Sequence, residues 1–533
     1  MSTSSRLVLF DTTLRDGAQM EGLALTVEDK LRIAQKIDEL GVQYIEGGWP
    51  GSNPKDEEFY ARAPHELRLK HAKLVTFSST RRAGTTPGKD PNLRITVGAA
   101  TPVVCIVGKS WDLHVREALR TTLDENLKMV GDTVKYLKRH FDEVFFDAEH
   151  FFDGYKRNPA YAMRVLEAAA GSGADCLVLC DTNGGCLPGE VGEIVARVRA
   201  EIATPLGIHC HNDTDCAVAN SLAAVEAGAV HVQGTINGYG ERCGNANLAS
   251  IAANLDLKKG IDVITREQLG RLSEVAHFVA EVANRTPNPQ QPYVGSSAFA
   301  HKAGLHASAV ARRRDLYEHV DPGLVGNVRH LVVSELAGKA TILVKAGELG
   351  VDLGEGDRTI AGVIRRVKEL EHLGYHFEAA DGSFELLLRR ATGWEQEFFT
   401  IESFRVIVET DGTGAISSEA TVKLHAGGRR YISTAEGNGP VNALDAALRK
   451  ALVESFPQLE RIHLADYKVR LLNENVGTGA TTRVLIESTD GEKEWATIGV
   501  SENIIAASWE ALLDGYVYGL LHGRLAPAEP ASG

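Results

Sequence analysis

Eight short apolar segments, each followed by a segment with helical periodicity, constrain the fold of this chain most strongly. Apolar runs of this length that alternate with amphipathic helical patterns predict parallel strands joined by crossover helices. Eight such units within about 250 residues are the size of a (β/α)8 barrel. We therefore predict an α/β fold with an N-terminal (β/α)8 TIM barrel. The predicted strands are 7–10, 42–46, 73–77, 103–107, 143–147, 176–181, 206–211 and 230–233.

An open, doubly wound sheet is the alternative arrangement for this pattern. That fold normally has a glycine-rich phosphate-binding turn after its first strand. Here the first strand runs into Asp11-Thr-Thr-Leu-Arg-Asp-Gly17, which is not such a turn. The first helix is predicted to begin at Thr26, because Thr26 and Asp29 have the spacing of a capping box.

Side chains that can bind a metal ion gather at the carboxyl ends of the predicted strands, where barrel enzymes place their reactive groups. His209 and His211 project to the same side of an extended strand. Asp16 follows the first strand and Asn245 follows the eighth. These four residues offer oxygen and nitrogen ligands to a divalent ion and leave positions for substrate. Mg²⁺, Mn²⁺ and Zn²⁺ are all compatible with this set.

Each of these residues also has a purely structural explanation. The two histidines can pack inside a barrel, and Asp16 can cap a turn. Arg15 can pair with Glu149, and Asn245 can cap a helix that begins near residue 246. Because all of them lie on the same predicted rim, we favour the metal site.

Charge and hydropathy limit the classes of partner and location. The formal net charge is −14 and no long basic run is present, which disfavours nucleic acid or an anionic membrane as a partner. No apolar run reaches the length of a membrane span, and the N-terminal residues lack the hydrophobic region of a signal peptide. The seven cysteines form no Cys-x-x-Cys pair, which favours reduced thiols. We expect a cytoplasmic protein.

Several motifs resemble those of the DRE-TIM metallolyase superfamily. They are residues 11–19, Glu149, the His209–His211 pair and residues 234–246. Residues 299–306 and 436–444 are similar to the linker and regulatory motifs of its 2-isopropylmalate, homocitrate and citramalate synthases. Residues 47–56 and 78–82 look most like the longer citramalate synthase type. Ala18 stands where isopropylmalate synthases usually have glutamate, which also favours that type.

The resemblance implies an acyltransferase that joins acetyl-CoA to a 2-oxo acid in a metal-dependent Claisen condensation and then hydrolyses the thioester. For the citramalate type the 2-oxo acid is pyruvate, and the product leads toward isoleucine. Arg15 is then expected to stabilise the developing oxyanion, and Glu149 to hold Arg15 or a water in place. Arg15, Thr182 and Glu46 are the expected substrate contacts.

The resemblance also implies a base that removes a proton from the acetyl methyl group. A histidine titrates in the range that this step needs. His306 is favoured by its position in the motif, assisted by Tyr317, with both residues delivered by a partner subunit of a homodimer. His301 is the competing candidate.

Three domains are predicted. Residues 1–269 form the barrel, residues 270–395 form helical linker subdomains, and residues 396–525 form a C-terminal α+β regulatory domain with an approximate ββα repeat. The resemblance places an amino-acid effector at Gly437, Asn438 and Gly439, with isoleucine expected and leucine as the second candidate. The same segment can instead be only a turn in which Pro440 enters a helix.

Two other functions remain open. One is a synthase of the same chemistry with a larger 2-oxo acid, namely a 2-isopropylmalate or homocitrate synthase. The other is a catalytically inactive amino-acid sensor on the same scaffold. The intact set of metal-ligating and catalytic residues argues against the sensor: Arg15, Asp16, Glu149, His209 and His211.

Overall fold

The computed structural model describes residues 7–301, 313, 316–331, 339–353, 357–394, 396–410, 412–472 and 479–523. The chain forms two compact units. The first consists of Met1–Phe299 with His319–Arg329, and the second of Ala300–Glu318 with His330–Gly533.

Eight parallel strands in the first unit form a closed barrel in the order β1 to β8. Pairing of β8 with β1, in which Val8 lies opposite His231, closes the sheet. The predicted (β/α)8 barrel is therefore confirmed, and the open doubly wound alternative is wrong. The strands are β1 (Val8–Asp11), β2 (Tyr44–Gly48), β3 (Lys73–Ser79), β4 (Val103–Lys109), β5 (Glu143–Glu149), β6 (Cys176–Asp181), β7 (Leu206–Cys210) and β8 (His231–Gly234).

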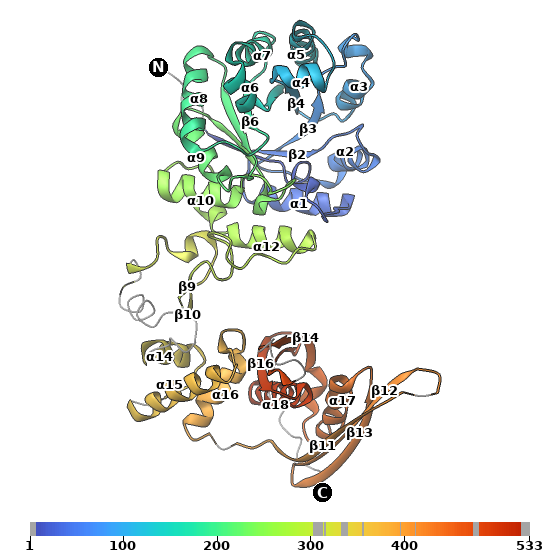
Figure 1. Cartoon of the computed structure of the whole chain (residues 1–533), viewed down its shortest axis with the longest axis vertical. Coiled ribbons are helices and arrows are strands. Elements are labelled where there is room, and N and C mark those ends of the chain that lie inside the picture. The colour runs from blue at the N-terminus through green and yellow to red at the C-terminus, as the bar shows by residue number, and fades with distance from the viewer. Residues whose placement is uncertain are drawn as a thin grey trace. The chain divides into compact units, whose positions relative to one another are not determined.

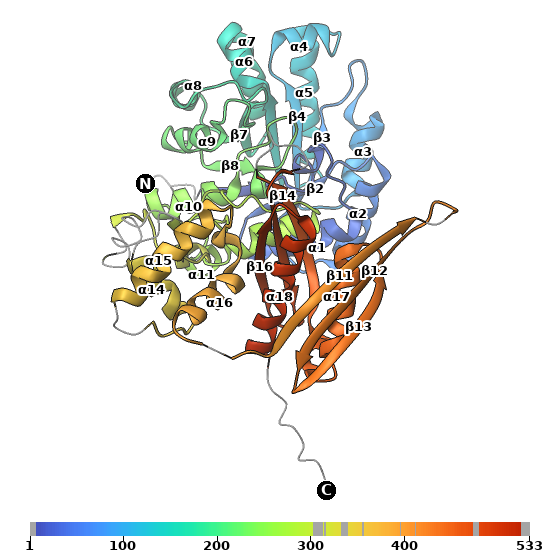
Figure 2. The same cartoon turned by 60° about the horizontal axis from the view of Figure 1, so that its bottom comes forward.

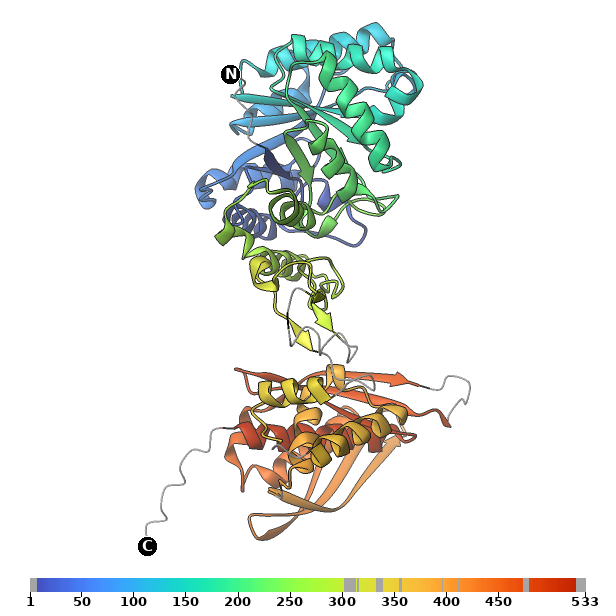
Figure 3. The same ribbon diagram turned by 90° about the vertical axis from the view of Figure 1, so that its left-hand side faces the viewer.

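Helices surround the barrel strands, as Figures 1 and 3 show. The helices of the first unit are α1 (Val27–Glu39), α2 (Pro54–Glu66), α3 (Pro91–Gly98), α4 (Asp112–Glu117), α5 (Leu123–Leu137), α6 (Phe151–Arg157), α7 (Pro159–Gly171), α8 (Pro188–Glu201), α9 (Ala217–Glu226), α10 (Leu248–Lys259), α11 (Arg266–Leu269) and α12 (Leu272–Val282). The start of α1 has the expected capping box. The Thr26 hydroxyl accepts from Asp29 N–H at 3.1 Å, and the Asp29 carboxylate accepts from Thr26 N–H at 2.8 Å.

Side chains of the barrel strands point alternately outward and inward, so the first unit has two hydrophobic cores. Side chains that point outward, such as Leu9 and Ile208, pack under the helices in one large buried cluster. Side chains that point inward fill the barrel and form a smaller cluster. The residues of the inner cluster are Phe10, Val75, Phe77, Val103, Cys105, Phe145, Cys176, Val178 and Cys180. The interior is thus a packed base on which polar groups at the carboxyl ends of the strands rest.

Within its described residues, the second unit begins with two short paired strands, β9 (Ala300–His301) and β10 (His330–Leu331), and the helices α14 (Lys339–Glu348), α15 (Asp357–His372) and α16 (Asp381–Ala391). Two three-stranded antiparallel sheets follow. The first has β11 (Phe399–Thr410), β12 (Ile416–Ala426), β13 (Arg429–Gly437) and then α17 (Pro440–Leu452). The second has β14 (His463–Leu471), β15 (Thr482–Thr489), β16 (Glu494–Ser501) and then α18 (Ile504–His522). In Figure 2, α17 lies along the first sheet and α18 along the second.

The repeat in this unit is βββα, so the expected ββα repeat is wrong in its number of strands. The strand missing from the prediction is β13, in which only Ser433 is buried. A strand that exposes most of its side chains has no apolar alternation to reveal it. The turn after β13 agrees with the simpler expectation, because Gly439 is the N-cap of α17 and Pro440 is its first residue.

Helix α18 corrects the expectation that no apolar segment reaches the length of a membrane span. By length and composition alone its 19 residues are a candidate span, but 50% of the apolar window is buried inside the protein. Trp509, Leu512, Tyr516 and Leu520 belong to the core that the two sheets and their helices share. A helix that buries its apolar side chains against sheets is typical of a protein core.

The capping box of α1 predicts a local stability effect. Replacing Thr26 with alanine removes the cap and should reduce the stability of α1 by about 1 kcal/mol, which corresponds to about fivefold faster exchange of its amides. Hydrogen–deuterium exchange of α1 measures this change. Thr26→Ser keeps the hydroxyl and should exchange at the original rate; equal rates for the alanine and serine variants would contradict the assigned cap.

Candidate metal centre

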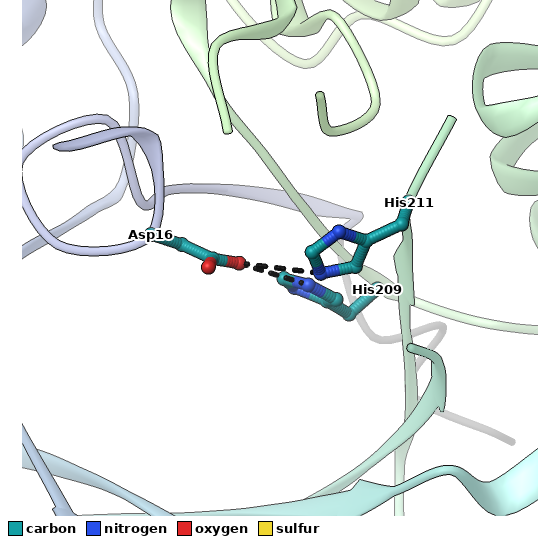
Figure 4. A group of neighbouring side chains, drawn as sticks. All are labelled: Asp16, His209 and His211. Atoms are coloured by element: carbon teal, nitrogen blue, oxygen red, sulfur yellow. Dashed lines mark ion pairs between the residues drawn. The ribbon is translucent and has the colours of Figure 1, made fainter. Parts of the chain in front are cut away.

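Asp16, His209 and His211 form a buried cluster at the carboxyl rim of the barrel, shown in Figure 4. His209 lies in β7, His211 follows that strand directly, and Asp16 lies in the turn after β1. Nε2 of His209 is 3.1 Å from Oδ2 of Asp16, and Nε2 of His211 is 3.7 Å from the same oxygen. The fold therefore brings three of the four predicted ligands together.

The spacing of these atoms suits a shared cation. Metal–ligand bonds of about 2.1 Å place two ligands at right angles about 3 Å apart. The 3.1 Å and 3.7 Å separations lie close to that value. The other ring nitrogen of His211, Nδ1, does not face Asp16; it is buried and has no partner among the described residues.

Asn245 completes the predicted ligand set and lies opposite His211 across an isolated β-bridge. It is only 2% exposed, yet Oδ1 and Nδ2 of its amide both lack a partner within the described part of the chain. A buried amide without a partner costs about 1–3 kcal/mol, so its oxygen is a suitable fourth ligand. The alternative in which Asn245 caps a helix is wrong, because Asn247 is the N-cap of α10.

The turn that presents Asn245 depends on glycine at position 244. Gly244 has a φ of +93°, and a Cβ there would lie 2.1 Å from the carbonyl oxygen of Gly238. That same oxygen accepts a hydrogen bond from the Asn245 N–H at 3.0 Å. Only glycine permits such a close approach at positive φ, so the sequence folds this loop back over the rim.

Arg15 lies beside the cluster with its guanidinium carbon 3.9 Å above the ring centre of Phe77. Its Nε donates to Oε2 of Glu46 at 2.6 Å, and its Nη1 is 3.3 Å from Oδ1 of Asp16. The expectation that Glu149 holds Arg15 is wrong, since the Glu149 carboxylate pairs with Lys109. The barrel order explains the difference: Glu46 lies in β2, next to β1, whereas Glu149 ends β5 on the opposite side.

Burial and charge shift the pKa values of the carboxylates. Burial by itself would raise the pKa of Asp16, but Arg15 and His209 outweigh it and hold that pKa far below its usual range. Burial raises the pKa of Glu46 to about 7, and the neighbouring Arg15 limits the rise. Burial would lower the pKa of Arg15, but Glu46 and Asp16 raise it instead. Asp16 and Arg15 are therefore a charged pair near neutral pH.

The two histidines differ in their electrostatic environment. Burial lowers the pKa of His211 to about 4, which keeps its ring neutral near pH 7. For His209 burial also acts to lower the pKa, but the hydrogen bond and charge of Asp16 raise it overall. A neutral imidazole retains a nitrogen lone pair for a metal ion, so His211 is ready to bind a cation near pH 7.

Thr182 and Glu149 lie after β6 and at the end of β5 respectively. The Thr182 hydroxyl accepts a hydrogen bond from the backbone N–H of His150 at 2.9 Å. The Ser110 hydroxyl donates to the backbone oxygen of Glu149 at 2.6 Å. Both residues are thus fixed at the same end of the barrel as the cluster, and their roles stay predictions.

The predicted base residues are only partly within the described part of the chain. His306 lies outside the described residues. His301 and Tyr317 belong to the second unit. Nε2 of His301 is 3.3 Å from Oε1 of Glu318, and the Tyr317 side chain is exposed. The choice between His301 and His306 stays a prediction.

The predicted effector residues form the turn between β13 and α17. Gly437 ends β13, and the N–H of Asn438 donates to Oδ1 of Asn442 at 3.1 Å. A Cβ at Gly437 would lie 2.5 Å from the Ala443 nitrogen, so the turn is packed closely against α17. Their part in effector binding stays a prediction.

Sequence reasoning missed a line of buried polar groups behind His209. Nδ1 of His209 lies 2.9 Å from Oε1 of Gln233, and Nε2 of Gln233 donates to Oδ1 of Asp147 at 3.0 Å. Gln233 is fully buried and Asp147 is 4% exposed. The available signal was alternation in β8, where His231 and Gln233 flank the apolar Val232 and therefore point into the barrel.

The first unit is thus a closed (β/α)8 barrel with a candidate metal site, Asp16, His209 and His211, on its carboxyl rim. The HMGL-like family matches residues 6–279 of the chain. A second family, described as "Homocitrate synthase post-HMGL domain-like", matches residues 293–374. A third, described as "LeuA allosteric (dimerisation) domain", matches residues 378–520.

Curated relatives extend over almost the whole chain. An (R)-citramalate synthase of Streptomyces coelicolor is 57% identical over 523 residues, which cover 98% of this chain and 98% of the relative. An (R)-citramalate synthase of Aquifex aeolicus is 54% identical over 97% of this chain and 98% of the relative. The chain therefore belongs to the (R)-citramalate synthase family, within the HMGL-like proteins. The predicted resemblance is confirmed.

A relative named as a 2-isopropylmalate synthase is less similar in sequence to this chain. A probable 2-isopropylmalate synthase of Methanopyrus kandleri is 33% identical over 96% of this chain and 97% of the relative. The comparisons therefore do not favour the alternative of a 2-isopropylmalate synthase.

The cluster predicts the effect of removing a ligand. Asp16→Ala or His209→Ala should lower kcat/KM by about 1,000-fold or more, because a Lewis-acid cation contributes several kcal/mol to the transition state. Calorimetric titration with Mn²⁺ and thiol release from acetyl-CoA measure the loss. Asp213→Ala, which changes a nearby carboxylate paired with Arg242, should retain binding and activity. Full activity of either ligand variant at saturating Mn²⁺ would rule out this metal centre.

Proposed function

We propose that this chain catalyses (R)-citramalate synthesis, in which acetyl-CoA condenses with pyruvate and the thioester is hydrolysed to give citramalate and CoA. The observation that carries the proposal is the buried Asp16–His209–His211 cluster beside Arg15. It occurs in a chain that is between 46% and 57% identical, over nearly its full length, to five curated (R)-citramalate synthases. Thiol release from acetyl-CoA with a panel of 2-oxo acids tests the proposal.

The residues proposed to hold a divalent cation are Asp16, His209 and His211, with the unpaired amide oxygen of Asn245 as the fourth ligand. When bound, Mg²⁺, Mn²⁺ or Zn²⁺ supplies Lewis-acid polarisation of the keto group of the 2-oxo acid. Mixed oxygen and nitrogen ligands are compatible with all three ions. The unpaired buried amide atoms of Asn245 support this assignment.

Arg15 is proposed to stabilise negative charge that develops on the keto oxygen. Its guanidinium is held by Glu46 and by the face of Phe77, and only its Nε–H is committed to Glu46. Nη1 lies 3.3 Å from Oδ1 of Asp16, so the Nη2 donors are the ones that can face substrate without a change in side-chain position. Donors fixed in a water-poor site lose little energy to reorganisation as the charge develops. Glu46 contributes to substrate binding by holding Arg15.

His306 of a partner subunit, assisted by Tyr317, is proposed to remove the proton from the acetyl methyl group, with His301 as the competing base. A histidine supplies a base close to neutral pH. Thr182 is proposed to bind the carboxylate of the 2-oxo acid. Glu149 is proposed to hold a water in place, a role that its pairing with Lys109 leaves open.

We propose that the protein is a cytoplasmic homodimer and that three segments of each chain have different functions. Residues 1–269 carry the chemistry, residues 270–395 link and deliver the base, and residues 396–525 bind an amino-acid effector. The match of residues 378–520 to an allosteric dimerisation domain supports the dimer and the effector. Among the described residues, metal-type clusters occur only at Asp16, His209 and His211, so the C-terminal segment suits binding better than catalysis.

Substrate size predicts a preference for pyruvate over 2-oxoisovalerate of about 100-fold or more in kcat/KM. A pocket sized for one methyl group excludes a branched chain by overpacking, while a larger pocket discriminates only weakly against the smaller acid. Initial rates with both acids at one Mn²⁺ concentration measure the ratio. Comparable rates would move the assignment to isopropylmalate synthesis.

If the turn at residues 437–439 binds an amino-acid effector, isoleucine should inhibit the enzyme and Gly437→Ala should relieve the inhibition. The added Cβ would displace the start of α17, which it approaches within 2.5 Å. A coupling of about 1–3 kcal/mol corresponds to a 5- to 150-fold effect on apparent affinity or activity. The measurement is activity against added isoleucine and leucine, with calorimetric binding alongside.

Gly412→Ala is the matched control for this experiment, since a Cβ at Gly412 meets no atom within 4 Å. It should leave inhibition and uninhibited activity unchanged. If neither amino acid binds the unsubstituted enzyme, the effector proposal fails and a purely dimerising role explains the domain better.

A further inference from the structure

We propose that Gln233 is a positioning residue that fixes the ring orientation and tautomer of His209 and thereby sets the affinity of the site for a divalent cation. The inference rests on the proposed metal site and assigns a function to a side chain that is fully buried.

The barrel register places the two residues side by side. His209 in β7 and Gln233 in β8 are partners in the parallel ladder, so both side chains point into the barrel from neighbouring strands. Oε1 of Gln233 lies 2.9 Å from Nδ1 of His209. Nε2 of the same histidine faces Asp16 at 3.1 Å. The imidazole therefore lies between the amide on one side and the candidate cation site on the other.

Asp147 determines which way the Gln233 amide points. A carboxylate oxygen accepts hydrogen bonds, and Oδ1 of Asp147 accepts one from Nε2 of Gln233 at 3.0 Å. Reversing the amide would place its oxygen against the carboxylate of Asp147. The amide oxygen of Gln233 is consequently the atom that faces His209.

The orientation of the amide in turn determines the tautomer of His209. Because a carbonyl oxygen can only accept, Nδ1 of His209 must carry the proton that forms this hydrogen bond. Nε2 is then the nitrogen that can lose its proton and offer a lone pair to a cation on the side of Asp16. Metal-binding histidines commonly donate their other N–H in this way, and loss of such a partner typically weakens metal binding 10- to 100-fold.

His211 provides an internal comparison. Its Nδ1 is buried without a partner among the described residues, so no corresponding hydrogen bond orients this ring. His209 is therefore held by the buried hydrogen bonds through Gln233 and Asp147, whereas His211 is held by packing. Gln233 acts on the first of them only.

The first test compares Mn²⁺ binding by the unsubstituted protein and Gln233→Met. Methionine has a similar length but neither accepts strongly from Nδ1 nor donates to Asp147. The dissociation constant for Mn²⁺, measured by calorimetry, should rise about 10- to 100-fold. Activity should recover at saturating Mn²⁺, because the variant weakens cation binding and leaves Arg15 unchanged. Thermal unfolding measured in parallel reports whether the variant is folded.

The second test exchanges the amide and the carboxylate in the double variant Gln233→Glu with Asp147→Asn. The exchange keeps the net charge, gives Nδ1–H of His209 a carboxylate acceptor, and lets the new amide at position 147 donate to it. Mn²⁺ affinity should return to within about threefold of the original, which a loss of packing alone would not produce. His231→Leu, two residues earlier on the same strand, is the control and should leave Mn²⁺ affinity unchanged.

Each outcome is decisive. Unchanged Mn²⁺ affinity in Gln233→Met, or an exchange variant as weak as Gln233→Met, would overturn the positioning role while the metal site stands. Failure of the unsubstituted protein to bind Mn²⁺ would overturn the metal site itself, and the positioning role with it.

Discussion

The negative charge of Asp16, held almost out of contact with water, is the constraint on which the candidate site depends. An ion buried without partners costs several kcal/mol, so the fold must supply opposing charge and hydrogen bonds at this point. It does so with Arg15, beside Asp16 in the chain, and with His209 from β7, while His211 lies just after β7 with its Nε2 3.7 Å from the same carboxylate. Arg15 in turn needs Glu46 from β2. The contacts of Arg15 with Glu46 and of Asp16 with His209 form together only in the closed barrel. There β1 pairs with β2, and its carboxyl end lies on the same rim as that of β7.

Closure also ties the two rim loops together. The Asp11 carboxylate accepts from the N–H and hydroxyl of Thr13 at 2.9 Å and 2.8 Å, and the Thr13 hydroxyl accepts from the Ile236 N–H at 2.9 Å. Ile236 begins the loop that ends at Asn245. The turn that carries Asp16 is thus hydrogen-bonded to the loop that carries Asn245. This cross-connection explains how Asp16 and Asn245, candidate ligands more than 200 residues apart in the chain, keep one geometry, as the proposed metal site requires.

The sequence predicted those features that depend on local periodicity. Short apolar runs located the eight barrel strands. The alternation of side chains along a strand placed His209 and His211 on one face, and the position of Asp16 after β1 gave the third candidate ligand. Side-chain partners across the barrel could not be predicted, because they depend on which strands are neighbours and how rotamers pack. Arg15 therefore pairs with Glu46 and not with Glu149. Strand β13 was missed for a related reason: its exposed polar side chains carry no burial signal.

The most direct measurement of whether Asp16, His209 and His211 form the catalytic metal site is pulsed electron paramagnetic resonance of the Mn²⁺-loaded protein. Couplings to ¹⁴N from two imidazoles are expected without substrate, because both Nε2 atoms face Asp16. Pyruvate labelled with ¹³C at its keto carbon should add a ¹³C coupling, since the proposed role of the ion is to polarise that carbonyl. Absence of imidazole couplings, or of the ¹³C coupling at saturating pyruvate, would contradict the proposed mechanism.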